Sequence, residues 1–441
     1  MLKILLLILI ALLGWIYLYR NFKKLDVTAM LLISYLLFFD IYTLIVFLKL
    51  DMPENDTVFI FTNIYLFFSV FAVLFAVKIL VKRKYLENIE FSNMLDQAST
   101  VSGKTVFYLF IITAIFLLYY FFRYGVLFRV PLEYMSIDIL NAYGIIMASF
   151  VLPIYYVLLI ISISKYFVHS KRVYKLLYLL LIITILSYLF FYSRREFILG
   201  IMIIVLLISV KQSNNIFTYK KIPRVLFLLF VVILASNLYQ NIRNPLMLYS
   251  ITKELKFEKS FIEYALDFES SSNNINDRLA ISYFAYMVID KSLVSSEVPL
   301  GGRLFSQNIT NAIPSIVYPD KKYITEDELI ADILNIRHKD YPTNMAISFF
   351  MDFWYFALFL FPLFLFAVIY VSLLIINIIY YNNLLYIMVM GELIYLLYNV
   401  ENSISDVFLY FRNIFILILV MKLFHIFRHL TYKKKITRLM N

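Results

Sequence analysis

Two adjacent arginines lie in a short connection between two apolar segments, in the run Ser193-Arg194-Arg195-Glu196-Phe197. Placing Arg at the centre of a membrane helix costs about 2.5–3.5 kcal/mol, and less near its ends. A guanidinium group can offset this cost because its planar fork binds phosphate oxygens through two parallel hydrogen bonds. Two other interpretations stay open, namely snorkelling of both side chains to lipid headgroups and a structural pair with Glu196.

Further basic residues lie in the one long polar segment of the chain, residues 241–343. Those that could contact the same anion are Arg243, Arg278, Arg303, Lys321 and Lys322. Gly301 and Gly302 precede Arg303, and glycine lets backbone N–H groups approach an anion closely. A basic loop residue is usually only solvated. The arginine pair and the basic loop together, if they share one face, predict an anionic ligand there.

Carboxyl groups that could act as a general base toward a hydroxyl group lie outside the apolar segments or, for Asp352, near the start of one. They are Glu133, Asp138, Asp290, Glu297, Asp352, Glu401 and Asp406. Most of them are expected to be structural or solvated, and the sequence does not choose the base. We place Glu401 and Asp406 in substrate binding. Asp40 and Glu392 fall inside apolar segments, where a functional role and a pairing with a neighbouring helix are both open.

Metal and cofactor chemistry has little support in the sequence. There is no Cys and there are four His, so a Cys-based zinc site is excluded. His425 and His429 are four positions apart beside Lys422 and Arg428, and this pattern favours a cationic interface anchor over a metal site. Nucleotide-binding and metalloprotease motifs are absent from the sequence, so we expect no cofactor and no metal.

The composition indicates an all-α, polytopic integral membrane protein. Hydrophobic residues make up 63% and charged residues 16% of the 441 residues, whereas soluble domains contain about 25% charged residues. A membrane span needs about 20 mostly apolar residues. About eleven spans are predicted, at 2–19, 27–48, 58–81, 105–122, 144–164, 176–192, 197–210, 225–240, 346–378, 384–400 and 407–427. We expect the ninth to start as an interfacial helix around Trp354 and then to cross.

Lysine and arginine set the expected orientation, because short cytoplasmic loops are enriched in both. Most of them outside 241–343 follow spans one, three, five, seven and eleven, which places the N-terminus outside and the C-terminus in the cytoplasm. The net charge of +11 therefore indicates membrane topology, and we expect no nucleic-acid partner.

The chain divides into four expected regions. Residues 1–240 hold transmembrane helices 1–8, residues 241–343 form an extracytoplasmic loop, residues 344–430 hold helices 9–11, and residues 431–441 are a basic cytoplasmic tail. In the loop we expect short interfacial helices at 252–268, 277–291 and 326–334. In the third of these, Thr325 and Glu328 form a capping box. The acidic run Glu326-Asp327-Glu328 then complements the helix dipole in its first turn.

The pattern resembles bacterial O-antigen polymerases of the Wzy type, also called oligosaccharide repeat-unit polymerases. The resemblance rests on about eleven spans with a long late loop, on the Ser-Arg-Arg start of a span, and on short loop motifs. These motifs are Pro299-Leu300-Gly301-Gly302-Arg303, Ala312-Ile313-Pro314-Ser315, Tyr318-Pro319-Asp320-Lys321-Lys322 and Thr343-Asn344-Met345-Ala346. The sequence departs from the family at Arg195-Glu196, where a small residue is usual.

The resemblance implies a glycosyltransferase that joins lipid-linked repeat units into O-antigen or capsular polysaccharide at the outer face of a bacterial plasma membrane. Donor and acceptor would both be oligosaccharides on undecaprenyl pyrophosphate. Arg194 and Arg195, then Arg303 and Arg243, would stabilise the pyrophosphate leaving group. Membrane lipid is an expected partner, and a chain-length regulator protein is a further partner compatible with this family.

Two other activities share much of this pattern. A flippase for lipid-linked oligosaccharide would also need cationic groups, although in a central cavity and without a long outer loop. A ligase that moves finished glycan to another acceptor would look almost the same. A generic transporter is less favoured because the sequence shows no paired repeats and no helices broken by Gly or Pro.

Overall fold

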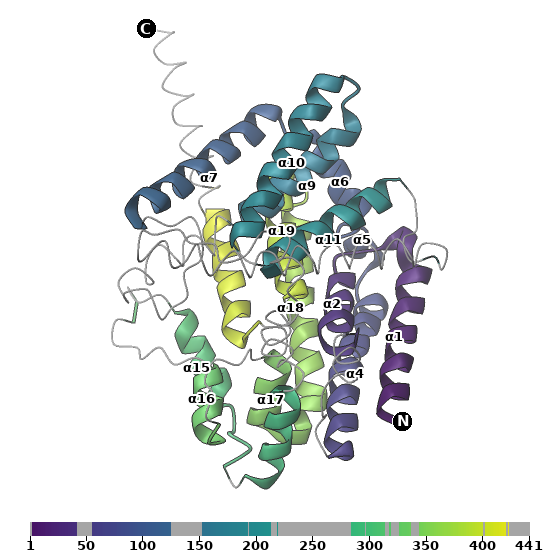
Figure 1. Ribbon diagram of the computed structural model, residues 1–441, viewed down its shortest axis with the longest axis vertical. Coiled ribbons are helices and arrows are strands. Elements are labelled where there is room, and N and C mark those ends of the chain that lie inside the picture. Colours follow the sequence, from purple (N-terminus) through teal and green to yellow (C-terminus); the bar gives the residue numbers. More distant parts are fainter. Residues whose placement is uncertain are drawn as a thin grey trace, which may run out of the picture.

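The computed structural model describes residues 2–41, 55–124, 152–192, 194–212, 284–295, 297–313, 326–336, 344–399 and 402–419, with four further single residues. The single residues are Thr218, Val317, Tyr318 and Lys422. For Arg194 and Arg195 the structure describes the backbone alone. In these ranges the chain is almost entirely helical, and strand pairing is limited to one bridge between Asp26 and Glu90. The all-α prediction is therefore confirmed for the described part of the chain (Figure 1).

The long helices α1, α4, α7, α10 and α11 begin and end close to predicted apolar segments, because each is a long run of mostly apolar residues. The N-terminal half contains α1 (Leu2–Asn21), α2 (Ala29–Tyr35), the π-helical η2 (Leu36–Ile41), α4 (Asp56–Leu80), α5 (Arg83–Glu87), α6 (Phe91–Thr100), α7 (Gly103–Tyr124), α9 (Leu152–Val168), α10 (Arg172–Tyr192) and α11 (Arg194–Lys211). The C-terminal half contains α15 (Arg303–Ala312), α16 (Glu326–Ile333), α17 (Met345–Phe353), η7 (Trp354–Phe356), α18 (Ala357–Ile379) and α19 (Asn383–Tyr398). Residues 284–294 and 404–419 are also helical.

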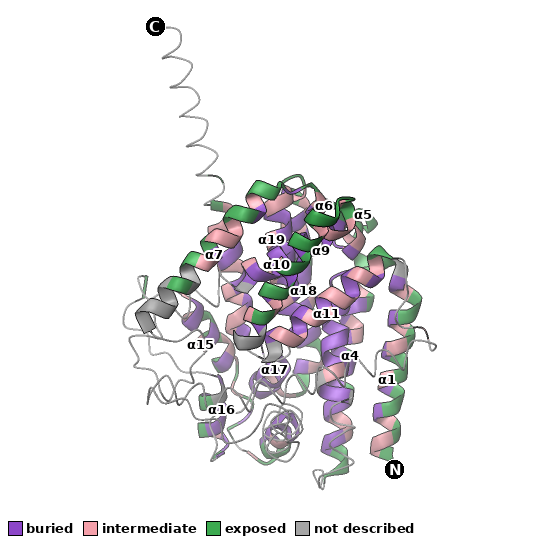
Figure 2. Cartoon of the chain, turned by 45° about the horizontal axis from the view of Figure 1, so that its top comes forward, coloured by how far each residue is buried: buried purple, intermediate pink, exposed green. Residues whose placement is uncertain are grey.

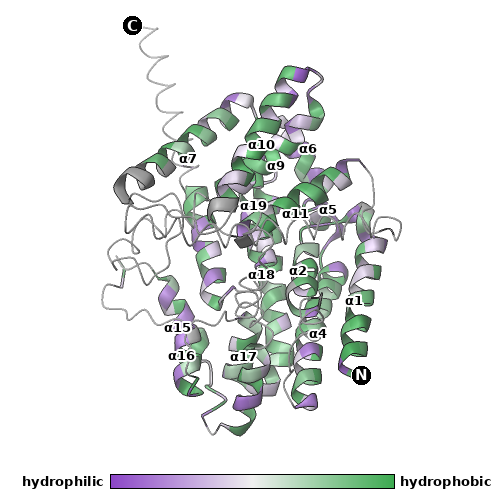
Figure 3. Cartoon of the chain, in the orientation of Figure 1, coloured by the Kyte–Doolittle hydropathy of each residue, from purple (hydrophilic) through white to green (hydrophobic). Residues whose placement is uncertain are grey.

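Large apolar side chains cover the outside of these helices, which is the reverse of a soluble protein. On α1, for example, Leu2 is 66% exposed and Leu12 is 54% exposed, whereas Asn63, Ser69 and Ser372 are buried inside the bundle. Figures 2 and 3 show exposed and hydrophobic surface together along α1 and α10. Lipid is the solvent that suits such a surface.

Four stretches are long and apolar enough to cross a membrane, namely Leu2–Asn21, Asp56–Leu80, Arg172–Leu189 and Met345–Ile379. A fifth is formed if α6 and the first part of α7, which are bent by 96° relative to each other, are taken as one span. These features are those of a helical membrane protein. The predicted span at 225–240 and the predicted loop helix at 252–268 lie outside the described residues.

The segment formed by α5 and α6 joins the ends of several long helices. Ser99 accepts a hydrogen bond from Lys165 of α9, and Asp96 accepts one from Lys211 of α11, at 2.5 and 3.2 Å. Asn88, between α5 and α6, donates to Asn377 of α18 at 3.2 Å. We call this side of the molecule the basic end. Two polar contacts that do not involve this segment, Lys3 with Asp56 and Asn55 with Asp290, lie where α1 and α4 begin, at their other ends.

The apolar stretch Met345–Ile379 reverses direction at Trp354, the residue around which an interfacial start of the segment 346–378 was predicted. Trp354 has φ 51° and ψ −135°, and the helix ends there. The ring of Phe349 in α17 lies 5.6 Å from Phe361 and 5.1 Å from Phe364, so α17 folds back against the first half of α18. Only α18, with 23 residues, is left as a continuous helix long enough to cross.

Candidate functional site

A buried carboxyl group joins three separate elements near the start of the last helix. Glu326, the first residue of α16, is 5% exposed. Its Oε2 atom accepts a hydrogen bond from Ser348 Oγ of α17 at 2.5 Å, and its Oε1 atom accepts one from the backbone N–H of Ile404 at 3.0 Å. Burial raises the pKa of Glu326 to about 7, with Asp406 nearby adding to the rise. Glu326 therefore positions α16, α17 and the helix 404–419 against one another.

The connection between α19 and the helix 404–419 is a tight polar turn. Asn402 donates from its side chain to the carbonyl oxygen of Leu396 at 2.7 Å, and its own carbonyl oxygen accepts from the N–H of Met345 at 3.1 Å. Asp406 accepts from the backbone N–H and the hydroxyl group of Ser403, at 2.7 and 2.9 Å. Ser403 and Asp406 thus form a capping box for the last helix.

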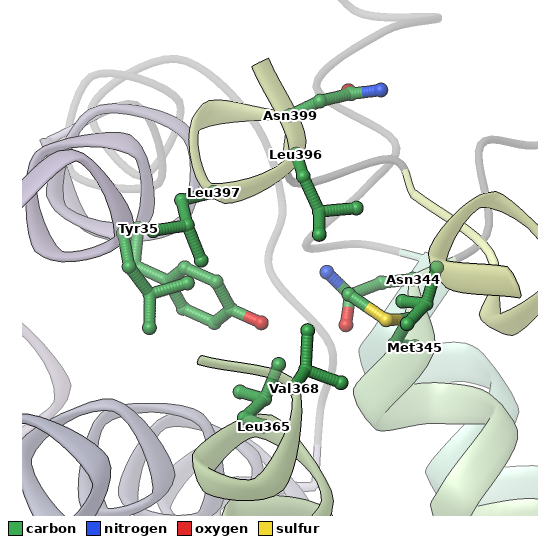
Figure 4. Close-up of a pocket in the computed structure, with 10 residues that line it drawn as sticks. Tyr35, Asn344, Met345, Leu365, Val368, Leu396, Leu397 and Asn399 are labelled. Atoms are coloured by element: carbon green, nitrogen blue, oxygen red, sulfur yellow. The ribbon is translucent and has the colours of Figure 1, made fainter. Parts of the chain in front are cut away.

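A small cavity of about 10 Å³, room for about one water molecule, lies beside this turn. The side chains of Tyr35 and Asn344 face each other across it, with Leu365 and Val368 on one side (Figure 4). Asn344 caps α17 by accepting from the N–H of Ala346 at 2.7 Å, and it is hydrogen bonded to the hydroxyl group of Tyr35. We call Tyr35, Glu326, Asn344, Ser348, Asn399, Asn402, Ser403 and Asp406 the central polar cluster.

The central polar cluster lies at the level of the middle of α18. Val368, the middle residue of the helix Ala357–Ile379, lines the same cavity as Asn344 and Asn399. In a membrane, irregular backbone at such a depth is tolerated where it is buried in protein or lines a polar cavity. Two non-helical segments therefore reach the level of the middle of α18, and this placement makes the central polar cluster the candidate functional site.

The start of α11 is fixed to the same region through Glu196. The carboxyl group of Glu196 is buried and accepts hydrogen bonds from the hydroxyl groups of Tyr156 in α9 and Tyr395 in α19, the latter at 3.3 Å. Tyr395 lies four residues before Asn399, a separation of about 6 Å along a helix. The first turn of α11, which contains Arg194 and Arg195, is therefore joined through Glu196 to the helix that leads into the central polar cluster.

The turn at Gly301 and Gly302 lies at the other end of α17. Both glycines have positive φ, 62° and 89°, which favours glycine at these positions. Asp352 fills the turn, because its carboxylate accepts from the N–H groups of Leu304 and Phe305 at 3.0 and 2.8 Å, and its carbonyl oxygen accepts from Gly301 N–H at 3.0 Å. The carboxylate of Asp352 thus occupies the position next to these N–H groups where the sequence predicted a bound anion.

The predicted site residues consequently fall into separate groups. Asp406 belongs to the central polar cluster, and the first turn of α11, with Arg194 and Arg195, is joined to α19 through Glu196. Gly301, Gly302 and the exposed Arg303 instead lie near Asp352, eight residues and about 12 Å along α17 from Asn344. Arg243, Arg278, Lys321, Lys322 and Glu401 lie outside the described residues, as do Glu133 and Asp138.

The other carboxyl groups singled out from the sequence lie away from the central polar cluster or within helices. Asp290 accepts from Asn55 at 3.0 Å near the start of α4, and Glu297 is exposed. Asp40 is 1% exposed in η2, and neither of its oxygens has a partner among the described residues. Glu392 lies in α19. The described residues contain no group of three His, Asp or Glu side chains placed to hold a metal ion.

Sequence reasoning missed four members of this region. Glu326 was expected to complement its own helix dipole, and α16 does begin at Glu326, but its carboxylate accepts from α17 and from Ile404. Asn344, Ser348 and Tyr35 had no assigned role. The signal available in the sequence was a polar Asn344 at the border of an apolar stretch, where it could cap a helix.

The chain was compared with protein-family models, with curated proteins and with solved structures, and none of the three comparisons gives a match. The functional assignment therefore rests on the residues and their geometry.

Proposed function

We propose that the chain is a polymerase of lipid-linked oligosaccharide repeat units, acting at the outer face of a bacterial plasma membrane. The proposal includes about eleven spans, an extracytoplasmic segment at 241–343, an outer N-terminus and a cytoplasmic C-terminus. On this topology the basic end faces the cytoplasm, in agreement with the positive-inside rule. The central polar cluster and the start of α11 are then reached from the outer side.

The observation that supports the proposal most is that the central polar cluster lies at the level of the middle of α18. The first turn of α11 is joined to α19 by the contact between Glu196 and Tyr395, and the turn after α19 is joined to α16 and α17 by Glu326 and Asn402. The start of α17 and the turn after α19 meet beside the middle of α18. A lipid-anchored pyrophosphate reaches a membrane protein from the side, at the depth of the headgroups or below, so two arginines here suit it.

In the proposed reaction, the bond between the anomeric carbon of the growing glycan and its pyrophosphate oxygen breaks. A new bond forms from that carbon to a hydroxyl oxygen of the next repeat unit. Arg194 and Arg195 stabilise the negative charge that builds on the leaving pyrophosphate. The hydroxyl proton passes to a carboxylate on the same face. Undecaprenyl pyrophosphate is released, and neither a nucleotide sugar nor a metal is needed.

The test compares the glycan of cells that lack the chain and are complemented with variants. We expect the deletion to leave single repeat units, and Arg194→Ala/Arg195→Ala to restore long chains at a rate lower by about 100-fold or more, the usual loss for a charge-stabilising donor. Arg303→Ala should lower this rate less, because the turn that holds Arg303 lies about 12 Å along α17 from Asn344. Chain lengths are read on gels of surface and lipid-linked glycan.

A matched control is available on the same helix pair. Lys171 and Arg172 flank the opposite end of α10 and are exposed. Lys171→Ala/Arg172→Ala should therefore restore long chains if membrane levels match those of the native chain. Equal restoration by the two double variants would remove the arginine pair from the mechanism.

A flippase for the same lipid-linked oligosaccharide is the second candidate, favoured by one observation. The structure contains a break at Trp354 between α17 and α18, and α6 and α7 are bent by 96° relative to each other. Discontinuous helices are typical of transporters. In that case the deletion would accumulate single units facing the cytoplasm, whereas loss of a polymerase leaves them facing outward.

A further inference from the structure

A groove between α1 and α4 combines an apolar floor with two cations. It has a volume of about 390 Å³ and is lined by Leu13, Ile16, Tyr17, Arg20 and Asn21 of α1 with Phe71 of α4. Leu13, Ile16, Tyr17 and Arg20 follow one face of α1, since they are spaced three and four residues apart. The groove therefore runs along the helix for about two turns, from apolar side chains to a charged end.

Lysine and arginine converge on that charged end. Lys78 of α4 donates to Asn21 Oδ1 at 2.7 Å, and its ammonium group lies 4.4 Å from the centre of the Tyr17 ring. Arg20 is exposed and forms no hydrogen bond or ion pair with any other described residue. Each cation lies in the last turn of its own helix, where it complements the helix dipole, and the two helix ends bring both cations to one groove.

The carboxyl groups near this end have hydrogen-bond partners of their own. Asp26 accepts from Thr28, including a backbone hydrogen bond of 3.0 Å, and burial raises its pKa. Glu90 is hydrogen bonded by Ser92, and its pKa is also raised by burial. Lys24 adds a further exposed cation next to α1. The excess of positive charge at this end of the groove therefore favours the binding of an anion.

We propose that this groove binds an anionic phospholipid from the leaflet at the basic end, with its phosphate between Arg20 and Lys78 and an acyl chain over Leu13, Ile16 and Phe71. Both cations lie at the ends of apolar helices, which is the level of lipid headgroups, and the floor below them is apolar. Basic grooves between helices on the cytoplasmic side are a recurrent way of holding anionic lipids. The site is independent of the polymerase activity.

Native mass spectrometry of the full chain from nanodiscs tests the proposal, with phosphatidylglycerol and phosphatidylcholine as probes. We expect one tightly retained phosphatidylglycerol and no retained phosphatidylcholine. Arg20→Gln should weaken retention about five-fold, and Arg20→Gln/Lys78→Gln about 30-fold, since each basic residue near an anionic surface contributes comparably. Leu13→Trp, which fills the floor, should also release the lipid.

Arg83→Gln is the matched control, because Arg83 lies at the same end but pairs with Glu87 on the surface. It should retain phosphatidylglycerol like the native chain. Equal retention of both lipids, or retention unchanged in Arg20→Gln, would overturn the proposal. Arg20→Gln alone decides the matter if the double variant fails to fold. Displacement of phosphatidylglycerol by a polyprenyl phosphate at equal concentration would instead assign the groove to the carrier lipid.

Discussion

Glu196 joins the first turn of α11, which contains Arg194 and Arg195, to the neighbouring helices α9 and α19. Its buried carboxyl group accepts from Tyr156 and Tyr395, which come from two different helices. A buried polar group that loses a partner costs about 1–3 kcal/mol. We expect Tyr156→Phe/Tyr395→Phe to lower the melting temperature in detergent and to reduce polymerisation, because the first turn of α11 is no longer fixed. The exposed Tyr108 gives the control Tyr108→Phe, which should change neither.

Glu326 makes stability depend on pH in a direction opposite to that of an ordinary salt-bridged carboxylate. Burial raises its pKa from 4.5 to about 7, so the folded chain holds this proton more tightly than the unfolded chain. The free energy of unfolding should therefore fall as pH rises from about 4.5 to about 7, by up to about 3 kcal/mol, and stay level above.

Glu326→Gln keeps the shape of the neutral carboxyl group without its proton equilibrium. Melting temperatures are measured between pH 5 and pH 8. Their fall with rising pH should disappear in Glu326→Gln and persist in Glu328→Gln, which changes an exposed residue of the same helix. A slope that persists unchanged in Glu326→Gln would contradict the assignment.

At the scale of elements, Gly391 sets how closely α19 approaches α9. A Cβ atom added there would lie 3.3 Å from a methyl carbon of Val157. Gly391→Leu should therefore force the two helices apart at a cost of about 1–3 kcal/mol, and with them Tyr395 and Tyr156. Gly103→Ala is the control, because its nearest neighbour would be Tyr178 Oη at 3.8 Å, an ordinary contact. Thermal unfolding of both variants in the same detergent checks this.

The long helices could be predicted because an uninterrupted apolar run leaves the chain one way to satisfy its backbone in lipid. Residues 58–81 were predicted and α4 is Asp56–Leu80; residues 176–192 were predicted and α10 is Arg172–Tyr192. A change of direction around Trp354 was expected, but the reversal itself was not, since residues 345–356 contain no Gly or Pro that would mark a break. It follows from packing of Phe349 against Phe361 and Phe364.

The candidate site could be predicted only in part for a similar reason. The arginine pair stands out because its charge is unusual between apolar segments. Glu326, Ser348 and Ile404 are far apart in the sequence, and no period links them. Their contact depends on how α16, α17 and the last helix pack, which a single sequence does not specify.

At the scale of the whole molecule, the absence of Cys from the sequence offers a direct test of orientation. Single cysteines placed at the exposed Glu297 and Lys171 should react differently with a membrane-impermeant maleimide. In right-side-out vesicles we expect Glu297→Cys to be labelled and Lys171→Cys to react only after permeabilisation. The reverse pattern would invert the topology and place the central polar cluster on the cytoplasmic side.

The contacts of Glu326 and Met345 with residues 402–404 also bear on the order in which the chain folds during synthesis. Glu326 and Met345 leave the ribosome before the backbone groups that complete their hydrogen bonds. The nascent chain therefore cannot complete these hydrogen bonds until the turn after α19 has been synthesised. A product terminated before Asn402 leaves the Glu326 carboxyl group without its hydrogen bond from Ile404, so complete assembly of the central polar cluster requires that synthesis has passed this point.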